Sequence, residues 1–328
     1  DERMPTASMS KVMTGYMVFE ALKAGRLTLD SKVRVSERAW RMEGSRTYLD
    51  LGSEVRVEDL IKGMVIQSGN DAAVALAEAV GGTEEGFASM ANERARQLGM
   101  KNSSFANASG MPNPNHYSTA RDLALLAYHV IHEYPEYYKY DSELEFRYNN
   151  INQQNRNPLL RMNIGADGVK TGHTDESGYS LIGSAVQNGR RLILVVMGMP
   201  TVKERSDEAA RLMQWGFSST GVYTLLKPNQ VVENAAVWMG IAPSVPVMVR
   251  DEVKVTLTRE ARSSLKAEVV MNEPVPAPIA SGQQVGVVRV TAPGIEMQEY
   301  PVFAQAEVPE LGFLGRLTAK ARYFVSGE

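Results

Sequence analysis

The chain has 328 residues, 44% of them hydrophobic, which is enough to bury a sizeable core in one large domain or in two. The formal net charge of −3 argues against nucleic acid as a partner, and the absence of cysteine excludes disulfides, a cysteine nucleophile and cysteine-ligated metals. The four histidines show no metal-binding spacing, so we expect neither a metal nor another cofactor.

Helices dominate the first part of the chain. Apolar residues at helical spacing, bounded by Gly, Pro and capping residues, predict helices over residues 8–25, 57–67, 71–80, 83–98 and 118–132. A short strand is expected at Val33-Arg-Val, and a loop rich in Asn, Pro, Ser and Gly over 102–117. No apolar run is long enough to span a membrane, and no signal peptide is visible.

Strand signals follow the helices. They predict strands over 143–150, 178–187 and 190–198, the last two joined by an Asn-Gly turn, and then a helix over 205–217. This order of helices and antiparallel strands places residues 1–226 in the α+β class. From residue 227 to 309, short strands alternate with Pro and Gly turns, which predicts a small all-β domain that serves as a spacer or an interaction module.

The last segment, 310–328, changes character again. Its apolar residues share one side of a helix, and basic residues flank them: Leu314, Leu317, Ala321, Phe324 and Val325, with Arg316, Lys320 and Arg322. A basic amphipathic helix at a chain end is typical of attachment to a membrane surface. The alternative is a terminal helix that docks on its own domain.

Ser8 and Lys11 lie one turn apart at the start of the first predicted helix. A helix start favours developing negative charge, and an amine of lowered pKa next to a hydroxyl can take its proton. The pair therefore has the makings of an activated nucleophile, although Ser-x-x-Lys alone is common by chance.

Two later motifs support that interpretation. Ser68 and Asn70 stand two residues apart in a turn between helices, where both side chains can face one cleft. Lys170-Thr171-Gly172-His173 precedes the strand pair, and a Lys with a Thr suits a carboxylate, while Gly172 allows a peptide to approach closely. Taken singly, each motif reads as an ordinary turn or cap.

Ser-x-x-Lys, Ser-x-Asn and Lys-Thr-Gly in this order are the signature of penicillin-binding proteins and class A β-lactamases. The chain resembles the low-molecular-mass penicillin-binding proteins, the D-alanyl-D-alanine carboxypeptidases of the penicillin-binding protein 5 kind, which are serine peptidases of the S11 type. The likeness covers essentially the whole chain and includes Lys11-Val-Met-Thr, Gln67-Ser-Gly-Asn-Asp-Ala, Ser118-Thr-Ala-Arg-Asp, Asn155-Arg-Asn, Asp167-Gly-Val-Lys-Thr-Gly-His-Thr and Gln214-Trp-Gly-Phe. It implies a transpeptidase-like domain over 1–226.

The resemblance also implies the chemistry. Ser8 would attack the carbonyl between the two terminal D-alanines of a peptidoglycan stem peptide, and Lys11, its pKa lowered by nearby Lys170, would take the Ser8 proton. Ser68 would pass a proton to the leaving D-alanine. Substrate binding would fall to the residues Asn70, Lys170, Thr171, Gly172 and His173. The N–H groups of Ser8 and His173 would form the oxyanion hole. β-Lactams would acylate Ser8 and stall.

The same resemblance implies a periplasmic protein held peripherally at the inner membrane by its C-terminal helix. Two departures stand out: the first strands of the transpeptidase-like sheet are expected to be missing, with reduced stability as a result, and the Gly44-Ser45-Arg46 loop has Arg where a small residue is expected. Two other functions are weighed. A class A β-lactamase would need an acid in the loop Asn107–His116, which has none. A non-catalytic wall-binding scaffold would not need the whole set of motif residues.

Overall fold

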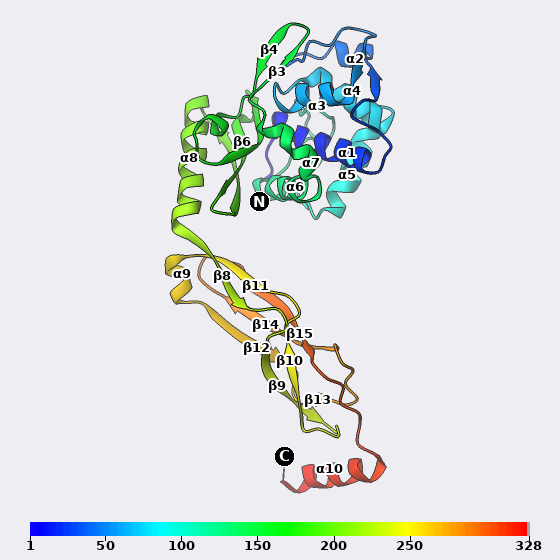
Figure 1. Ribbon diagram of the computed structural model, residues 1–328, viewed down its shortest axis with the longest axis vertical. Helices are drawn as coiled ribbons and strands as arrows, with labels where there is room; N and C mark the ends of the chain where they lie inside the picture. Colours follow the sequence, from blue (N-terminus) through cyan, green and yellow to red (C-terminus); the bar gives the residue numbers. More distant parts are fainter. Residues whose placement is uncertain (327–328) are drawn as a thin grey trace. The chain divides into compact units, whose positions relative to one another are not determined.

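The computed structural model describes the backbone of residues 1–326 and the side chains of residues 1–319. The chain forms two compact units, Asp1–Gly216 and Phe217 onward (Figure 1). This division lies ten residues before the expected one at 226/227. The reason is that strand β8 (Thr220–Leu226), which follows the division, pairs with β11 (Val253–Thr258) of the second unit.

The helices of the first unit, apart from the last, form a block around one core. Their bounds are η1 Ala7–Ser10, α1 Lys11–Lys23, α2 Glu37–Trp40, α3 Val57–Val65, α4 Asn70–Gly81, α5 Glu84–Gln97, α6 Ala120–Glu133, α7 Pro135–Tyr138, η2 Lys139–Ser142, η3 Pro158–Arg161 and α8 Val202–Ser219. Helix α1 is buried along most of its length, with Met13, Val18 and Phe19 in the core. Thr83 caps α5 as expected, because its Oγ1 accepts a hydrogen bond from Gly86 N.

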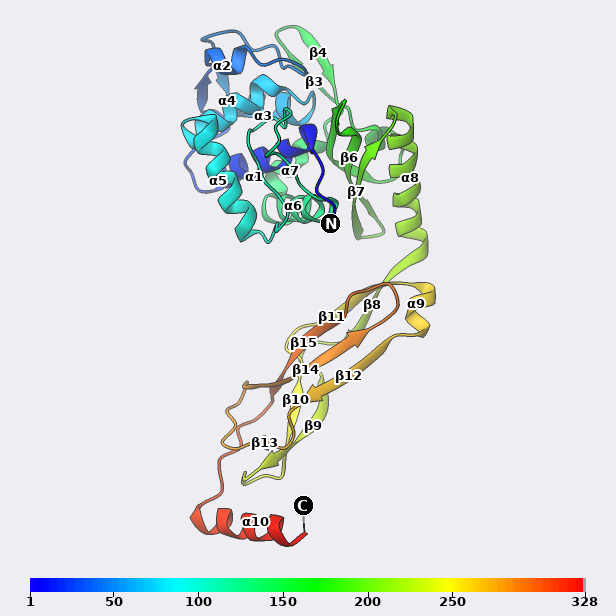
Figure 2. The same cartoon turned by 180° about the vertical axis from the view of Figure 1, so that it is seen from behind.

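An antiparallel sheet in the order β5-β6-β7 lies beside the helical block. Its strands are β5 Ala166–Thr174, β6 Gly178–Gln187 and β7 Arg190–Met199. Figures 1 and 2 show α8 along one side of this sheet and the other helices along the opposite side. Strand β5 is one of the two edge strands, and η1 packs against it. A Cβ at Gly172 of β5 would lie 2.8 Å from Thr6 O, so glycine is what lets the two approach so closely.

Two short antiparallel strand pairs complete the first unit. β1 (Lys32–Arg34) pairs with β2 (Glu54–Arg56), and β3 (Glu145–Tyr148) pairs with β4 (Ile151–Gln154). The prediction of one strand over 143–150 is therefore wrong. Asn149 and Asn150 have φ angles of 46° and 60°, and these left-handed residues turn the chain back.

The second unit is mostly β. Its strands besides β8 and β11 are β9 Val231–Trp238, β10 Ser244–Met248, β12 Lys266–Met271, β13 Val275–Pro276, β14 Gln284–Thr291 and β15 Gln298–Ala304, with short helix α9 Arg259–Ser263 and C-terminal helix α10 Phe313–Ser326. The larger sheet has the order β12-β14-β15-β10-β9-β13. Alternate valines such as Val245, Val247, Val288 and Val290 form its own core. The succession of short strands after residue 227 is as expected.

Candidate active site

Ser8 lies in η1, one turn before α1, and not in the α-helix as the sequence predicted. Ala7, just before it, has a φ of 47°, a left-handed conformation that is costly for a residue with a Cβ. Lys11 is the first residue of α1. The turn and the helix together bring Lys11 Nζ to 2.8 Å from Ser8 Oγ.

Lys11 is almost fully buried, at 1% exposure, and its amine is surrounded by acceptors. Besides Ser8 Oγ, Nζ donates hydrogen bonds to Asn70 Oδ1 and to Ser109 O, both at 2.7 Å. Asn70 was a predicted neighbour. Ser109 was missed, because its contribution is a backbone carbonyl in a loop, and side-chain identity does not reveal such a contact.

The environment lowers the pKa of Lys11 well below its ordinary value. Burial is the largest cause, the nearby charge of Lys170 comes next, and Arg156 adds to both. The expected influence of Lys170 is thus present, but removal of the amine from water outweighs it. A lowered pKa increases the share of the free amine, which is the form that can accept the proton of Ser8.

Ser68 and Asn70 join α3 to α4 as the sequence indicated. Ser68 has a φ of 69°, and its buried Oγ has no hydrogen-bond partner among the described residues. Asn70 is the first residue of α4, and its Nδ2 donates to Glu43 O at 2.6 Å. Asp71 then accepts from the backbone N–H groups of Thr47 and Tyr48, so the start of α4 also fixes the neighbouring loop.

Most of the predicted site residues line one cleft of about 630 Å³. Its lining contains Ser8, Gly44, Ser45, Ser68, Asn70, Ser109, Gly110, Met111, Arg156, Thr171, Gly172, His173, Thr174, Tyr179, Val202 and Arg205. Three motifs that are far apart in the sequence therefore open onto one space, between η1, the α3–α4 turn and the edge strand β5.

Lys170 lies behind this lining, not in it. Its side chain is 3% exposed, and Nζ donates to Thr171 O at 3.1 Å. Burial, aided by Arg156, lowers the pKa of Lys170 to about 7, while the charge of Asp141 opposes that shift. Lys11, Asp141 and Lys170 together border a small cavity of about 10 Å³.

Comparison with known proteins identifies the family of both units of the chain. Residues 1–201 match the family model described as "D-alanyl-D-alanine carboxypeptidase" (peptidase S11), and residues 222–310 match "Penicillin-binding protein 5, C-terminal domain". The chain belongs to the S11 family of D-alanyl-D-alanine carboxypeptidases.

Individual relatives agree along nearly the full chain. D-alanyl-D-alanine carboxypeptidase DacC of Escherichia coli is 40% identical over 97% of this chain and 81% of its own. Crystal structures of penicillin-binding protein 5 from Haemophilus influenzae superpose with a TM-score of 0.85 at 38% identity, covering 94% of this chain and 92% of theirs. Penicillin-binding protein D2 of Listeria monocytogenes, solved in an ampicillin-bound form, has a TM-score of 0.61 at 34% identity, covering 66% of this chain and 89% of its own.

Membership of the S11 family confirms the predicted fold and favours a carboxypeptidase over a class A β-lactamase or a non-catalytic scaffold. It also agrees with the loop at residues 107–116, which contains no acid and instead presents Ser109 O to Lys11. Within the described residues no group of acids and histidines could hold a metal ion, and no helix is long and apolar enough to cross a membrane.

Two arginines of this S11 cleft were not among the predicted site residues. Arg156 donates to Ser45 Oγ at 2.6 Å, and Arg205, from α8, lines the same end of the cleft. Arg156 falls in the Asn155-Arg-Asn motif, which was a usable signal, whereas nothing in the local sequence marks Arg205. Arg46, the unexpected residue of its loop, donates to Trp40 O at 2.8 Å and does not line the cleft.

Proposed function

We propose that this chain removes the terminal D-alanine from peptidoglycan stem peptides ending in D-Ala-D-Ala, through an acyl-enzyme on Ser8. The observation that carries the proposal is the set of three contacts of Lys11 Nζ. A neutral amine has two N–H groups and one lone pair. If the N–H groups serve Asn70 Oδ1 and Ser109 O, the lone pair is left facing Ser8 Oγ.

In the acylation step, Ser8 Oγ bonds to the carbonyl carbon between the two D-alanines, and its proton passes to Lys11 Nζ. The oxygen of the tetrahedral intermediate is held by the N–H groups of Ser8 and His173, each such donor being worth about 3 kcal/mol. The C–N bond then breaks. Ser68 Oγ, unpartnered among the described residues and facing the cleft, relays the proton to the leaving amine.

Water completes the reaction by attacking the acyl carbon, with Lys11 again taking the proton. A β-lactam follows the same first step, but its leaving amine remains tethered to the acyl group. Because the loop at 107–116 supplies no acid to activate water, the penicilloyl enzyme turns over slowly.

Substrate binding is assigned to the edge of the sheet. A peptide lying along β5 adds a strand there, and Gly172 permits its close approach. The carbonyl of the substrate amide replaces Met111 Sδ, 3.6 Å away, as acceptor of the second N–H of Asn70 Nδ2. The terminal carboxylate lies at the end of the cleft that Thr171 and His173 line, and Arg205 adds positive charge there. Lys170 acts from behind that wall through its charge. His173 stacks on Tyr179 with ring centroids 3.9 Å apart, which fixes its side chain.

The test is D-alanine release from diacetyl-Lys-D-Ala-D-Ala by the wild type and by Ser8→Ala, together with mass spectrometry of both after penicillin. We expect the wild type to release D-alanine and to gain one penicilloyl group on Ser8, and Ser8→Ala to do neither. Equal release by the two proteins would refute the proposed mechanism.

We also propose a periplasmic protein attached peripherally to the inner membrane through α10. Phe313, Leu314 and Leu317 are 70%, 78% and 55% exposed, so the second unit leaves these apolar side chains uncovered, contrary to the docked-helix alternative. The remaining apolar and basic residues expected there, from Lys320 on, lie outside the described side chains.

The β9–β10 hairpin extends this apolar surface. Its tip is joined to the segment before α10, because Leu311 N donates to Met239 O at 2.8 Å and Ile241 N to Pro309 O at 2.9 Å. Ile241 is 63% exposed beside that junction. The hairpin tip and α10 therefore present one interfacial surface, with Arg316 to meet anionic headgroups.

Vesicle flotation tests the attachment. The wild type should float with phosphatidylglycerol-containing vesicles and less with pure phosphatidylcholine; Leu314→Glu should abolish flotation and Ile241→Glu should weaken it. Met297→Glu is the control, because Met297 is 57% exposed, close to Ile241 at 63%, but lies outside this surface. Flotation of Leu314→Glu at the wild-type level would exclude α10 as the anchor.

A further inference from the structure

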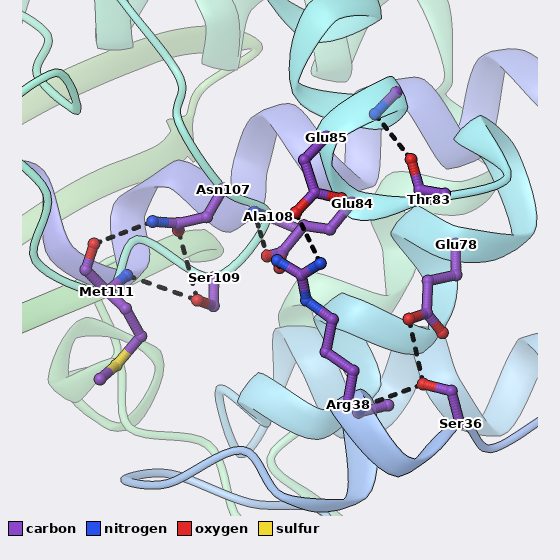
Figure 3. Close-up of polar contacts among 12 residues, drawn as sticks. Ser36, Arg38, Glu78, Thr83, Glu84, Glu85, Asn107, Ala108, Ser109 and Met111 are labelled. Carbon is purple, nitrogen blue, oxygen red and sulfur yellow. Dashed lines mark hydrogen bonds and ion pairs between the residues drawn. The ribbon is translucent and has the colours of Figure 1, made fainter.

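The loop at residues 107–111 forms one wall of the space around Lys11, and it is held by its own contacts. Asn107 Oδ1 accepts from Gly110 N at 2.7 Å. Asn107 Nδ2 donates to Met111 O at 3.0 Å (Figure 3). Gly110 has a φ of 81°, and a Cβ there would lie 1.8 Å from Ala7 O. The loop thus packs directly on the backbone that carries Ser8.

The backbone of Ala108 joins the loop to two helices by hydrogen bonds. Its N–H donates to Glu84 Oε1 at 3.0 Å, and its carbonyl accepts from Thr14 Oγ1 at 2.7 Å. Thr14 lies on α1, one turn after Lys11. Both peptide groups of Ala108 are therefore occupied, and the next carbonyl along the chain is Ser109 O, the acceptor of Lys11 Nζ.

Glu84 is unusual for its burial. It is the first residue of α5, its side chain is 5% exposed, and its Oε2 lies 2.7 Å from Arg38 Nη2. The same guanidinium meets Glu85 Oε1 at 2.7 Å, but the Glu85 side chain is 70% exposed (Figure 3). Arg38 thus bridges a buried and an exposed carboxylate, and of these two only Glu84 reaches the loop.

We propose that Glu84, held by Arg38, is a positioning residue for the reaction: by fixing Ala108 it places the Ser109 carbonyl against Lys11 Nζ. An ionised carboxylate is a stronger acceptor than a neutral oxygen, and a buried one needs a partner such as Arg38. The contact lies outside the cleft, so Glu84 does not touch substrate. It acts through the loop on the amine next to Ser8.

This inference rests on the role of Lys11 proposed above, and it predicts a specific kinetic change in Glu84→Ala. Acylation by a fluorescent penicillin should slow by about tenfold, a loss of the size expected when one buried hydrogen bond is removed. The KM for diacetyl-Lys-D-Ala-D-Ala should change less than twofold, since β5 and the carboxylate end of the cleft are untouched.

The pH profile distinguishes positioning from general damage. Without a well-placed Ser109 carbonyl, the ammonium form of Lys11 loses an acceptor, so its pKa falls and the acidic limb of the acylation rate moves to lower pH. Partial unfolding would lower the rate without moving the limb.

Three further variants complete the design. Glu84→Gln keeps a carbonyl oxygen for Ala108 N, and its acylation rate should stay within about threefold of the wild type. Glu85→Gln removes the exposed partner of Arg38 and should be acylated at the wild-type rate. Thr14→Val removes the hydrogen bond to Ala108 O and should move the acidic limb of the acylation rate in the same direction as Glu84→Ala. This variant therefore still tests the proposal if Glu84→Ala does not fold.

The outcomes distinguish a failure of the role proposed for Glu84 from a failure of the proposed function. If Ser8→Ala blocks acylation while Glu84→Ala and Thr14→Val keep the wild-type rate and acidic limb, only the role of Glu84 is overturned. Glu84→Gln as impaired as Glu84→Ala would also overturn it, because the acceptor would then not be what matters. Acylation of Ser8→Ala would overturn the proposed function itself.

Discussion

At the scale of single residues, the site depends on two lysines whose charge the protein controls by burial. Lys11 and Lys170 are both almost inaccessible, and removal from water lowers the pKa of each. Two arginines, Arg156 and Arg205, add positive charge nearby. Of the two buried carboxylates beside these cations, Asp71 raises the pKa of Lys11 and Asp141 raises the pKa of Lys170.

Asp141 gives a pH prediction. Burial raises the pKa of Asp141, the neighbouring charge of Lys170 lowers it, and the ionised Asp141 carboxylate in turn raises the pKa of Lys170. In Asp141→Asn that support is lost, so the pKa of Lys170 falls. If protonated Lys170 aids carboxylate binding, the alkaline limb of kcat/KM for a D-Ala-D-Ala peptide moves to lower pH.

The measurement is kcat/KM from about pH 5 to 10 for the wild type and Asp141→Asn. Asp59→Asn, in α3 and outside the cleft lining, is the control and should leave the limb in place. An unmoved alkaline limb in Asp141→Asn would show that Asp141 does not tune Lys170.

At the scale of elements, the site lies where one turn, the start of one helix and one strand of the sheet come together. Turn η1 carries Ser8, the start of α4 carries Asn70, and β5 carries Thr171 and His173. The closeness of η1 and β5 is set by Gly172, and the approach of the 107–111 loop to η1 by Gly110. Glycine is required at both places because backbone faces backbone.

Gly172→Ala tests this packing. The added Cβ would lie 2.8 Å from Thr6 O and 3.1 Å from Met9 Cγ, so η1 must move away from β5. We expect a loss of about 1–3 kcal/mol in the free energy of unfolding, typical of overpacking, and slower acylation. Thermal denaturation and penicillin acylation measure the two effects.

Gly312→Ala adds the same methyl group where nothing lies within 4 Å, and it should change neither quantity. If Gly172→Ala matched it in melting temperature and acylation rate, the close approach of η1 and β5 would not be important for the site.

At the scale of the whole molecule, the chain consists of a catalytic unit followed by a β-rich unit. The position of the border between the two units determines which fragments of the chain are stable. Strand β8 belongs by pairing to the second unit, where it is the partner of β11. A cut at 226/227 would separate the two strands, leaving β11 with an open edge and exposing its buried residues Val253, Val255 and Leu257.

We therefore predict that a fragment of residues 220–328 unfolds cooperatively at a higher temperature than one of residues 227–328. Circular dichroism melting of both fragments checks this. The complementary fragment 1–219 should still be acylated by penicillin. Equal melting of the two C-terminal fragments would place the border where the sequence predicted it.

The sequence by itself determined the family and the fold class, and it predicted the main site residues, because the motifs at Ser8, Ser68 and Lys170 are local and carry their chemistry in side-chain identity. Helix caps such as Thr83 and the strand pair at 178–198 were equally predictable, since their signals lie within a few residues. Only the tertiary structure decided that Lys170 lies behind the cleft, that Ser109 O and Arg205 join the site, and that Glu84 reaches the loop beside Lys11. These contacts join distant segments, through backbone groups or through burial, and neither leaves a local pattern in the chain.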